Sequence, residues 1–276
     1  MTQRWKQRPP GSNWGDFGPD DQRGRMNWVT REKVLQGVAE VKEGITFCLS
    51  LPLDYPGGTA LNPRRNPPRQ FATLRKGKQN FCYPLADENP VYTDVVCDDI
   101  VLLTLQYSTQ WDSFAHIGSR FDADGDGKPE IVFYNGFRAG EHVKPATEKV
   151  NAEAWAKYEG ARAEALGIQN LAEHGAQGRG VMIDLNAHFS RKRHAVSYDE
   201  LMRVLEADRV MVERGDMVCL YTGFADVILE LRKNPDPQLL HNTCTGLDGR
   251  DEKLLQWISD CGLSALIADN FAVEII

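Results

Sequence analysis

The 276-residue sequence lacks several patterns that would place it in a common class of protein. It has no apolar run near the roughly 18 residues that cross a membrane, and residues 1–15 lack the apolar core of a signal peptide. It also lacks the GxSxG, Walker A, GxGxxG and HExxH motifs, which argues against serine hydrolases, P-loop proteins and dinucleotide-binding proteins. We therefore expect a cytoplasmic protein without a membrane partner.

None of the six cysteines lies in a CxxC pair, which argues against a zinc ribbon or a thioredoxin-like motif. Because no export signal precedes them, we expect reduced thiols. Buried, unreactive side chains are the usual state of such cysteines. The six are Cys48, Cys82, Cys97, Cys219, Cys244 and Cys261.

The net charge of −7 conceals two regions of opposite sign. Residues 1–80 carry 14 Lys and Arg against 7 Asp and Glu, whereas residues 81–276 carry 18 against 32. A nucleic-acid-binding protein would gather its basic residues on one face, but the basic stretch here is broken by prolines and lacks helical spacing. We therefore expect no nucleic-acid partner, and a solvated loop that contacts an acidic surface of this chain or of a second subunit. The stretch holds Arg64, Arg65, Arg69, Arg75, Lys76 and Lys78.

Hydrophobic periodicity predicts strands and loops in the first half of the chain and alternating strands and helices in the second half. The loop-rich residues 1–30 and 54–80 hold many turn-forming residues, and the capping box Ser197–Tyr198–Asp199–Glu200 marks the start of a helix. This order favours one mixed α/β domain over residues 1–276. Thr30 can cap the first helix, which stops at Gly44, and the last helix carries Leu254, Leu255 and Ile258 on one face. The expected helices cover 31–44, 151–166, 198–207, 225–232 and 250–261, and the expected strands cover 45–53, 91–105, 131–134, 178–185, 217–223, 264–270 and 271–276.

A polar segment, Leu105–Gly118, follows a predicted buried strand, and strand ends are a usual place for a site in α/β folds. If the segment is extended, alternate residues point to one side. A carboxylate and two amide oxygens on that side could hold a divalent cation, and His116, four residues after Asp112, could serve as a general base. The alternative is a polar network that satisfies buried strand ends. The side chains on the predicted face are Gln106, Ser108, Gln110 and Asp112.

The acidic loop that follows is a second candidate site. Asp122, Asp124 and Asp126 fit positions 1, 3 and 5 of a calcium loop, but position 12 is Phe133 instead of a bidentate glutamate, and Glu130 falls at position 9. No helix is expected on either side, so the loop is not an EF-hand. A weaker calcium site and an acidic hairpin tip, in which glycines supply positive φ, remain as the two interpretations.

Six separated segments occur in a characteristic order: SNWGDFGPDDQRGRMNWVT, ITFCLSLPLD, STQWDSFAH, FYNG, GRGVMIDL and LYTG. In this order and spacing they resemble the cyclase family of metal-dependent hydrolases, whose members include bacterial kynurenine formamidase and isatin hydrolase. The resemblance covers about residues 12–275.

The family signature H-x-G-T-H-x-D-x-P-x-H falls on residues 106–116. The resemblance implies that the positions of Gln106, Gln110 and Asp112 bind Mn²⁺ or Zn²⁺ and that His116 is the acid and base. Glutamine replaces two histidines here, and its neutral oxygen suits a hard ion such as Mn²⁺ better than Zn²⁺. The family also places a His and a Glu ligand after the last strand, so we expect a chain truncated at its C-terminus relative to the family.

The resemblance further implies a swivelling β/β/α architecture, with a mixed sheet partly closed into a barrel, helices packed outside, and assembly as a homodimer or a larger homo-oligomer. The implied activity is hydrolysis of a cyclic or acyl amide or a lactone by metal-activated water. Four aromatic residues would either line a pocket for a small planar substrate or pack in the core: Trp111, Phe114, Tyr134 and Phe137. The alternative function is a non-catalytic relative that binds a small aromatic ligand or acts as a scaffold, which the two glutamines favour.

Overall fold

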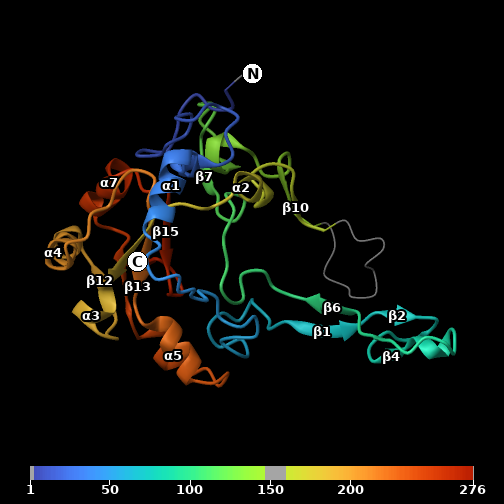
Figure 1. The fold of residues 1–276 in the computed structure, drawn as a ribbon. Coiled ribbons are helices and arrows are strands. Elements are labelled where there is room, and N and C mark those ends of the chain that lie inside the picture. The colour runs from blue at the N-terminus through green and yellow to red at the C-terminus, as the bar shows by residue number, and fades with distance from the viewer. Residues whose placement is uncertain (1–2, 147–159, 276) are drawn as a thin grey trace. The chain divides into compact units, whose positions relative to one another are not determined.

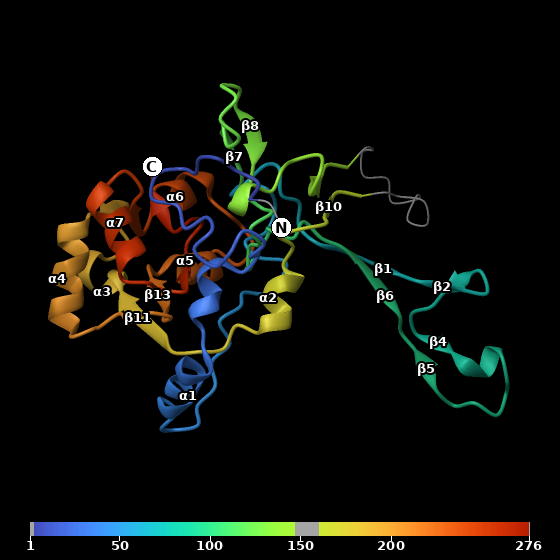
Figure 2. The same cartoon turned by 90° about the horizontal axis from the view of Figure 1, so that it is seen from above.

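The computed structural model describes residues 3–146 and 160–275 and divides the chain into two compact units. Unit 1 consists of Met1–Thr46, Trp111–Phe224 and Cys244–Ile276, and unit 2 consists of Phe47–Gln110 and Ala225–Thr243. Figures 1 and 2 label the helices and strands of both units. Compact units within a chain do not by themselves define folding domains, so the single domain over residues 1–276 stays a prediction.

Two parallel sheets of three strands each form the framework of unit 1 (Figure 1). In each sheet, the strand named second is the central one. The first sheet consists of β11 (Gly180–Asp184), β13 (Met217–Tyr221) and β15 (Ala265–Ala268). The second consists of β12 (His194–Val196), β14 (Thr245–Asp248) and β16 (Glu274–Ile275). The side chains of Ile183, Val218 and Leu247 are almost completely buried because they belong to one apolar core, whereas Met182, on the other face of β11, is 55% exposed. The strands predicted in residues 178–276 are confirmed.

Helices α4 (Tyr198–Asp208) and α7 (Glu252–Asp260) lie side by side in Figures 1 and 2 and pack on this core. The predicted capping box begins α4: the Ser197 hydroxyl accepts from the amide of Glu200, and the Glu200 carboxylate accepts from the amide of Ser197 at 2.9 Å. Asp251 begins α7 and also accepts from the Tyr198 amide at 2.7 Å, which ties the two helix starts together.

Only part of the apolar face predicted for α7 is buried. The side chain of Leu254 is 1% exposed, whereas that of the adjacent Leu255 is 49% exposed. Ile258, four residues after Leu254, packs against the core, as helical geometry requires of residues on one face. The shorter helix α3 (Leu185–Phe189) follows β11 and is capped by Asp184.

Helix α1 (Arg31–Ala39) begins as predicted at Thr30, whose hydroxyl accepts from the Lys33 amide at 3.3 Å. It ends at Ala39, five residues earlier than the predicted stop at Gly44. The helix lies close to the segment before β11: a Cβ added to Gly37 would lie 2.4 Å from the Gly178 carbonyl oxygen. This contact therefore requires glycine in the helix.

A buried ion network fixes α1 to the first sheet. The Asp216 side chain is fully buried and accepts from the Lys33 ammonium at 2.9 Å and the Arg179 guanidinium at 3.0 Å. Glu213, which is half-exposed, lies 3.4 Å from Lys33 and 3.1 Å from Arg179. Hydrogen bonds from Gln36 and Lys33 lower the pKa of Glu213.

The N-terminal loop packs on an antiparallel hairpin of β7 (Ser119–Phe121) and β8 (Glu130–Val132). Trp5 and Trp14 are buried, and their rings meet edge to face at 5.7 Å. The fully buried Asn135 (φ 53°) accepts from the Gly15 amide at 2.8 Å and donates to two carbonyls of the same loop. Within the described residues, positions 3–30 form loops and turns with a 3₁₀ helix at Gly24–Trp28, and this segment contributes Trp5 and Trp14 to the core. Helix α2 (Gln169–His174) comes later in the sequence, between β10 and β11.

Unit 2 is built from antiparallel pairs of short strands (Figure 2). The pairs are β1 (Arg69–Ala72) with β6 (Asp99–Leu102), β2 (Leu74–Arg75) with β3 (Lys78–Gln79), and β4 (Tyr83–Pro84) with β5 (Val95–Val96). A 3₁₀ helix, Leu85–Asp87, follows β4. Helix α6 (Pro237–His241) belongs to this unit, and α5 (Phe224–Glu230) begins at the unit boundary, close to the predicted 225–232.

Two predictions in the first half of the chain are wrong. Residues 45–53 form no strand, and Phe47 and Leu49 are 77% and 80% exposed, because among the described residues no strand pairs with them. A strand needs such a partner for its backbone hydrogen bonds. Residues 91–105 do contain β5 and β6, but these are not buried: Val101 is 49% exposed, because a two-stranded ribbon covers neither face.

The helix predicted over 151–166 lies partly outside the described residues, which resume at residue 160. Its last part is not helical. Instead β10 (Arg162–Ala163) pairs with β9 (Val143–Lys144), an antiparallel contact with a segment distant in sequence that overrides local helix propensity.

The mixed α/β class is confirmed by seven α-helices and small sheets among the described residues. These sheets have two or three strands, and within the described ranges none closes on itself. The partly closed barrel therefore stays a prediction. No helix in the part of the chain that the structure describes has the length and apolar character needed to cross a membrane.

Candidate functional site

The turn that carries Asp112 and His116 belongs to unit 1. The amide of His116 donates to the Ser113 carbonyl at 3.0 Å, which curls the chain so that the two side chains meet. The His116 Nε2 atom lies 3.9 Å from the Asp112 Oδ2 atom, and both groups remain accessible, with side-chain exposures of 28% and 42%. The predicted approach of a carboxylate to an imidazole at i, i+4 is therefore present.

Phe114, in the middle of this turn, fixes it to the protein interior. Its ring stacks on that of Tyr134 with centroids 4.7 Å apart. It also covers Gly24, where an added Cβ would lie 2.7 Å from the ring, so that glycine permits the close contact. Phe114 lies between Asp112 and His116 in the sequence, so its contacts with Tyr134 and Gly24 anchor the turn that carries this accessible pair.

Tyr134 in turn binds the N-terminal loop. Its hydroxyl donates to the Asp21 carboxylate at 2.9 Å. Burial, together with the negative charge of Asp21, raises the pKa of the Tyr134 phenol, which therefore stays protonated. Asp21 also accepts from the amide of Gly24 at 2.7 Å and from Asn27 at 2.7 Å, so its carboxylate is committed to holding this loop.

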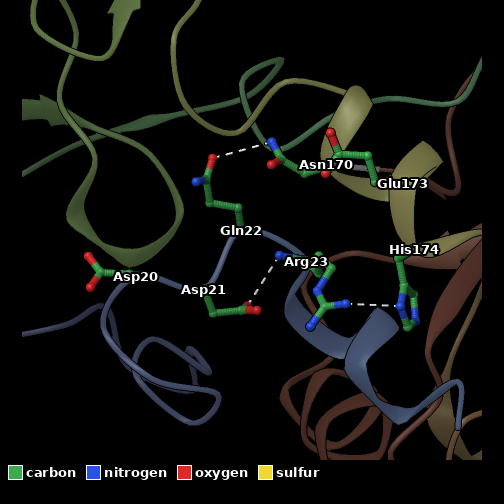
Figure 3. A pocket seen from close by; sticks show the side chains of 7 residues that line it. All are labelled: Asp20, Asp21, Gln22, Arg23, Asn170, Glu173 and His174. Atoms are coloured by element: carbon green, nitrogen blue, oxygen red, sulfur yellow. Dashed lines mark hydrogen bonds between the residues drawn. The ribbon is translucent and has the colours of Figure 1, made fainter.

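Beside this loop lies an open polar pocket of about 520 Å³, shown in Figure 3. Of the charged groups that line it, Arg23 comes from the N-terminal loop and Glu173 comes from α2. Gln22 is held by the Leu166 amide at 2.6 Å, and Asp20 pairs with Arg4 at 2.6 Å. The lining residues are Asp20, Asp21, Gln22, Arg23, Asn170, Glu173 and His174.

His174 is held in one tautomer at the edge of this pocket. Its Nε2 atom lies 3.0 Å from the Met26 carbonyl oxygen and must carry the proton. Its Nδ1 atom, 2.9 Å from the Arg23 guanidinium, must then be the acceptor. In this arrangement the imidazole accepts from Arg23 and orients it, and Figure 3 marks the bond between the two side chains.

The two glutamines of the predicted ligand set belong to unit 2, whereas Asp112 and His116 belong to unit 1. Within unit 2, the main-chain carbonyl of Gln106 accepts from Arg65 at 2.7 Å, and Gln110 is exposed. The metal site formed by Gln106, Gln110 and Asp112 stays a prediction.

The four aromatic residues differ in their surroundings. Phe114 and Tyr134 are stacked beside the candidate turn. Phe137 is buried under the Arg4 guanidinium, which lies 3.9 Å from its ring centroid, and Trp111 is 45% exposed. Three of the four pack with the N-terminal core, and their contact with a substrate stays a prediction.

The acidic loop lies on the hairpin of β7 and β8, as predicted, with strands and not helices beside it. Asp122, Asp124 and Glu130 bring carboxylate oxygens within 4.8 Å of one another. Arg138 already supplies a cation here, 3.1 Å from Glu130 and 3.8 Å from Asp124. The exposed Asp126 instead caps a turn by accepting from the Lys128 amide at 2.8 Å. A calcium ion in this loop stays a prediction.

One polar group missed by the sequence analysis lies at the carboxyl end of the first sheet. Asp269, just after β15, accepts from the amide and hydroxyl of the buried Thr222 at 2.7 Å and from the Gly223 amide at 3.0 Å. The signal was present, because a polar residue directly follows each of two buried strands, and parallel strand ends meet at one edge.

Comparison with solved structures defines the class of protein. The chain is similar to a crystal structure described as a novel cyclase, with a TM-score of 0.66 and 25% identity over 96% of this chain and 78% of that chain. The family model described as "Putative cyclase" matches residues 79–275. The chain therefore belongs to this cyclase family, as the sequence segments indicated. No curated protein matches it.

Proposed function

We propose that this cyclase-family chain is a metal-dependent hydrolase of a cyclic or acyl amide or a lactone. The observation that supports the proposal is the Asp112–His116 pair, with side chains 3.9 Å apart and accessible, at the positions of the carboxylate ligand and the acid/base in the family signature. Phe114 and Tyr134 beside the turn suit a small planar substrate.

The chemistry of the donor set fits a hard divalent ion. Asp112 would be the anionic ligand, and Gln106 and Gln110 would add neutral oxygens, so we propose Mn²⁺ in preference to Zn²⁺. When bound, such an ion supplies Lewis-acid activation of water and of the substrate carbonyl.

In this proposal His116 moves the proton. Its Nε2 atom accepts a proton from the attacking water and returns it to the leaving nitrogen or oxygen. Substrates would therefore be amides or lactones whose leaving group needs protonation.

The test is a pair of substitutions measured for turnover and for metal content. His116→Ala should lower turnover by about 10²–10⁴-fold, the usual contribution of a positioned acid/base, and should leave bound Mn²⁺ unchanged. Asp112→Ala should lower both, because it removes the anionic ligand. Formanilides, isatins and lactones are the substrates to assay.

A second imidazole–carboxylate pair offers a matched control. His188 lies 2.9 Å from Asp208 with the same 28% side-chain exposure as His116, but on a different part of unit 1. His188→Ala should leave turnover unchanged. Metal loss in His116→Ala with metal kept in Asp112→Ala would show that the two roles are reversed, and unchanged activity in both would place the site elsewhere.

A ligand-binding protein without catalysis is the second candidate, and the pocket of Figure 3 favours it. Its lining pairs a guanidinium oriented by His174 with carboxylates, which suits a small ligand bearing both charges better than a purely aromatic one. Absence of stoichiometric metal and of turnover would favour this function. For either function we propose a cytoplasmic homodimer or larger homo-oligomer, as the family resemblance implies.

A further inference from the structure

Two cysteines in unit 2 lie directly opposite each other beyond the short ladder of β4 and β5. The register pairs Tyr83 with Val96 and Pro84 with Val95, which sets Cys82 opposite Cys97. Their Sγ atoms are 3.9 Å apart, and both residues are exposed. The expectation of buried side chains is therefore wrong for these two cysteines, as it is for the exposed Cys48.

The backbone distinguishes the two thiols. The amide of Cys82 donates to the Cys97 Sγ atom at 3.1 Å, so the Cys97 sulfur has a backbone donor beside it. The Cys97 side chain in turn bonds to the Cys82 Sγ atom, which raises the pKa of Cys82. Because the Cys82 amide points at the Cys97 sulfur and the pKa of Cys82 is raised, we assign the attacking role to Cys97 and the resolving role to Cys82.

The spacing requires an adjustment to form a bond. The two Sγ atoms are 3.9 Å apart and would have to approach to the roughly 2.05 Å of a disulfide. A soft metal ion held by the two cysteines is disfavoured, because a tetrahedral site needs four ligands and the cysteines supply two. Among the described residues, metal-ligating side chains cluster in a group of three at Asp122, Asp124 and Glu130, and this group contains neither cysteine.

We propose that Cys82 and Cys97 form a thiol–disulfide exchange site that reacts with low-molecular-weight disulfides such as oxidised glutathione. The Cys97 thiolate attacks one sulfur of glutathione disulfide, forms a mixed disulfide and releases one glutathione. Cys82 then loses its proton and attacks the Cys97 sulfur, which releases the second glutathione. Two electrons pass from the cysteines to the glutathione disulfide, and the two cysteine protons end on the two released thiols.

The bond would close a loop that contains the residues between the two cysteines. Asp87, inside this loop, already forms an ion pair at 2.7 Å with Lys78, which precedes the loop in the sequence. The cross-link would restrict the opening of β4 and β5, because it removes conformations from the open state. Slower hydrogen exchange at the amides of residues 83–96 is the expected structural signature.

The experiment exposes the full chain to glutathione buffers of rising oxidised-to-reduced ratio, followed by acid quenching, unfolding, alkylation and peptide mapping. Cys82 and Cys97 should lose alkylation together and appear as one cross-linked peptide pair. Cys48, exposed in the same unit without a thiol neighbour among the described residues, is the internal control. The cross-link should form at a ratio of oxidised to reduced glutathione about tenfold or more below the ratio that glutathionylates Cys48, because the second step of cross-linking is intramolecular.

Two variants separate the roles of the thiols. Cys82→Ser should stop at a mixed disulfide of Cys97 with glutathione, and Cys97→Ser should leave Cys82 reacting more slowly. The wild-type peptide map decides the proposal even where a variant misfolds. Separate glutathionylation of Cys82 and Cys97 without the cross-link, or oxidation no easier than that of Cys48, would overturn it.

Discussion

The parallel sheets of unit 1 and the ribbon of unit 2 respond differently to the same kind of sequence. Strands β11 and β13 are short apolar runs, and Ile183 and Val218 in them are 1% and 0% exposed. Residues 45–53 and 91–105 are equally strand-like, yet the first forms no strand and the second an exposed ribbon. An apolar pattern therefore specifies a buried strand only where neighbouring strands and helices cover it.

The largest effect expected from this contrast is at the buried ion network. Asp216→Ala would leave the Lys33 ammonium and Arg179 guanidinium, 9% and 17% exposed, without the buried carboxylate that they share, and only the half-exposed Glu213 would remain beside both. Breaking a buried pair in this way costs about 3–5 kcal/mol of unfolding free energy. Denaturant unfolding followed by circular dichroism measures the loss. The matched change in the ribbon, Asp87→Ala, removes a solvent-exposed pair and should leave the midpoint in place.

The next effect compares two leucines. Leu254, 1% exposed on α7, should cost about 2–5 kcal/mol when replaced by alanine, because the change removes buried apolar surface and leaves a cavity. Leu74, 74% exposed in the ribbon, should change stability by less than about 0.5 kcal/mol. Equal losses in the two variants would show that the ribbon has a covered face in solution. The same unfolding measurement applies.

The smallest effect is at the start of α4, and it depends on pH. Ser197→Ala should cost about 1 kcal/mol at neutral pH, because it removes the cap. Burial alone would raise the pKa of Glu200, but hydrogen bonds from Ser197 and His194 outweigh it and lower that pKa. The carboxylate therefore stabilises the fold above its usual pKa, and this contribution is lost as the pH falls through the lowered value. The difference between wild type and variant should shrink in acid, and a constant difference would assign the effect to the serine alone.

The sequence predicted those parts of the fold whose signals are local. The caps at Thr30 and Ser197 and the strands after Gly178 depend on neighbouring residues, and they are present. The pairing of β9 with β10 and the burial of Trp5 depend on segments distant in sequence, and a local pattern carries no information about them.

The candidate site divides in the same way. The Asp112–His116 contact is an i, i+4 relation within one turn, so its spacing was visible in the sequence. The anchoring of that turn is not local: Phe114 meets Gly24 and Tyr134, and Tyr134 bonds to Asp21. The pocket beside it joins residues separated by about 150 positions, as in the Arg23–His174 bond, whose sequence separation is 151.

The bond between Lys33 and Asp216 spans 183 residues and has a consequence for biosynthesis. Lys33 of α1 is made before its anchoring carboxylate, which follows 183 residues later in the chain. At about 5–20 residues per second, the nascent helix waits roughly 10–40 s for that partner. Throughout this interval Lys33, which is buried against Asp216 in the folded protein, has no Asp216 to bind, so this anchor of α1 can form only after the first sheet has begun to emerge.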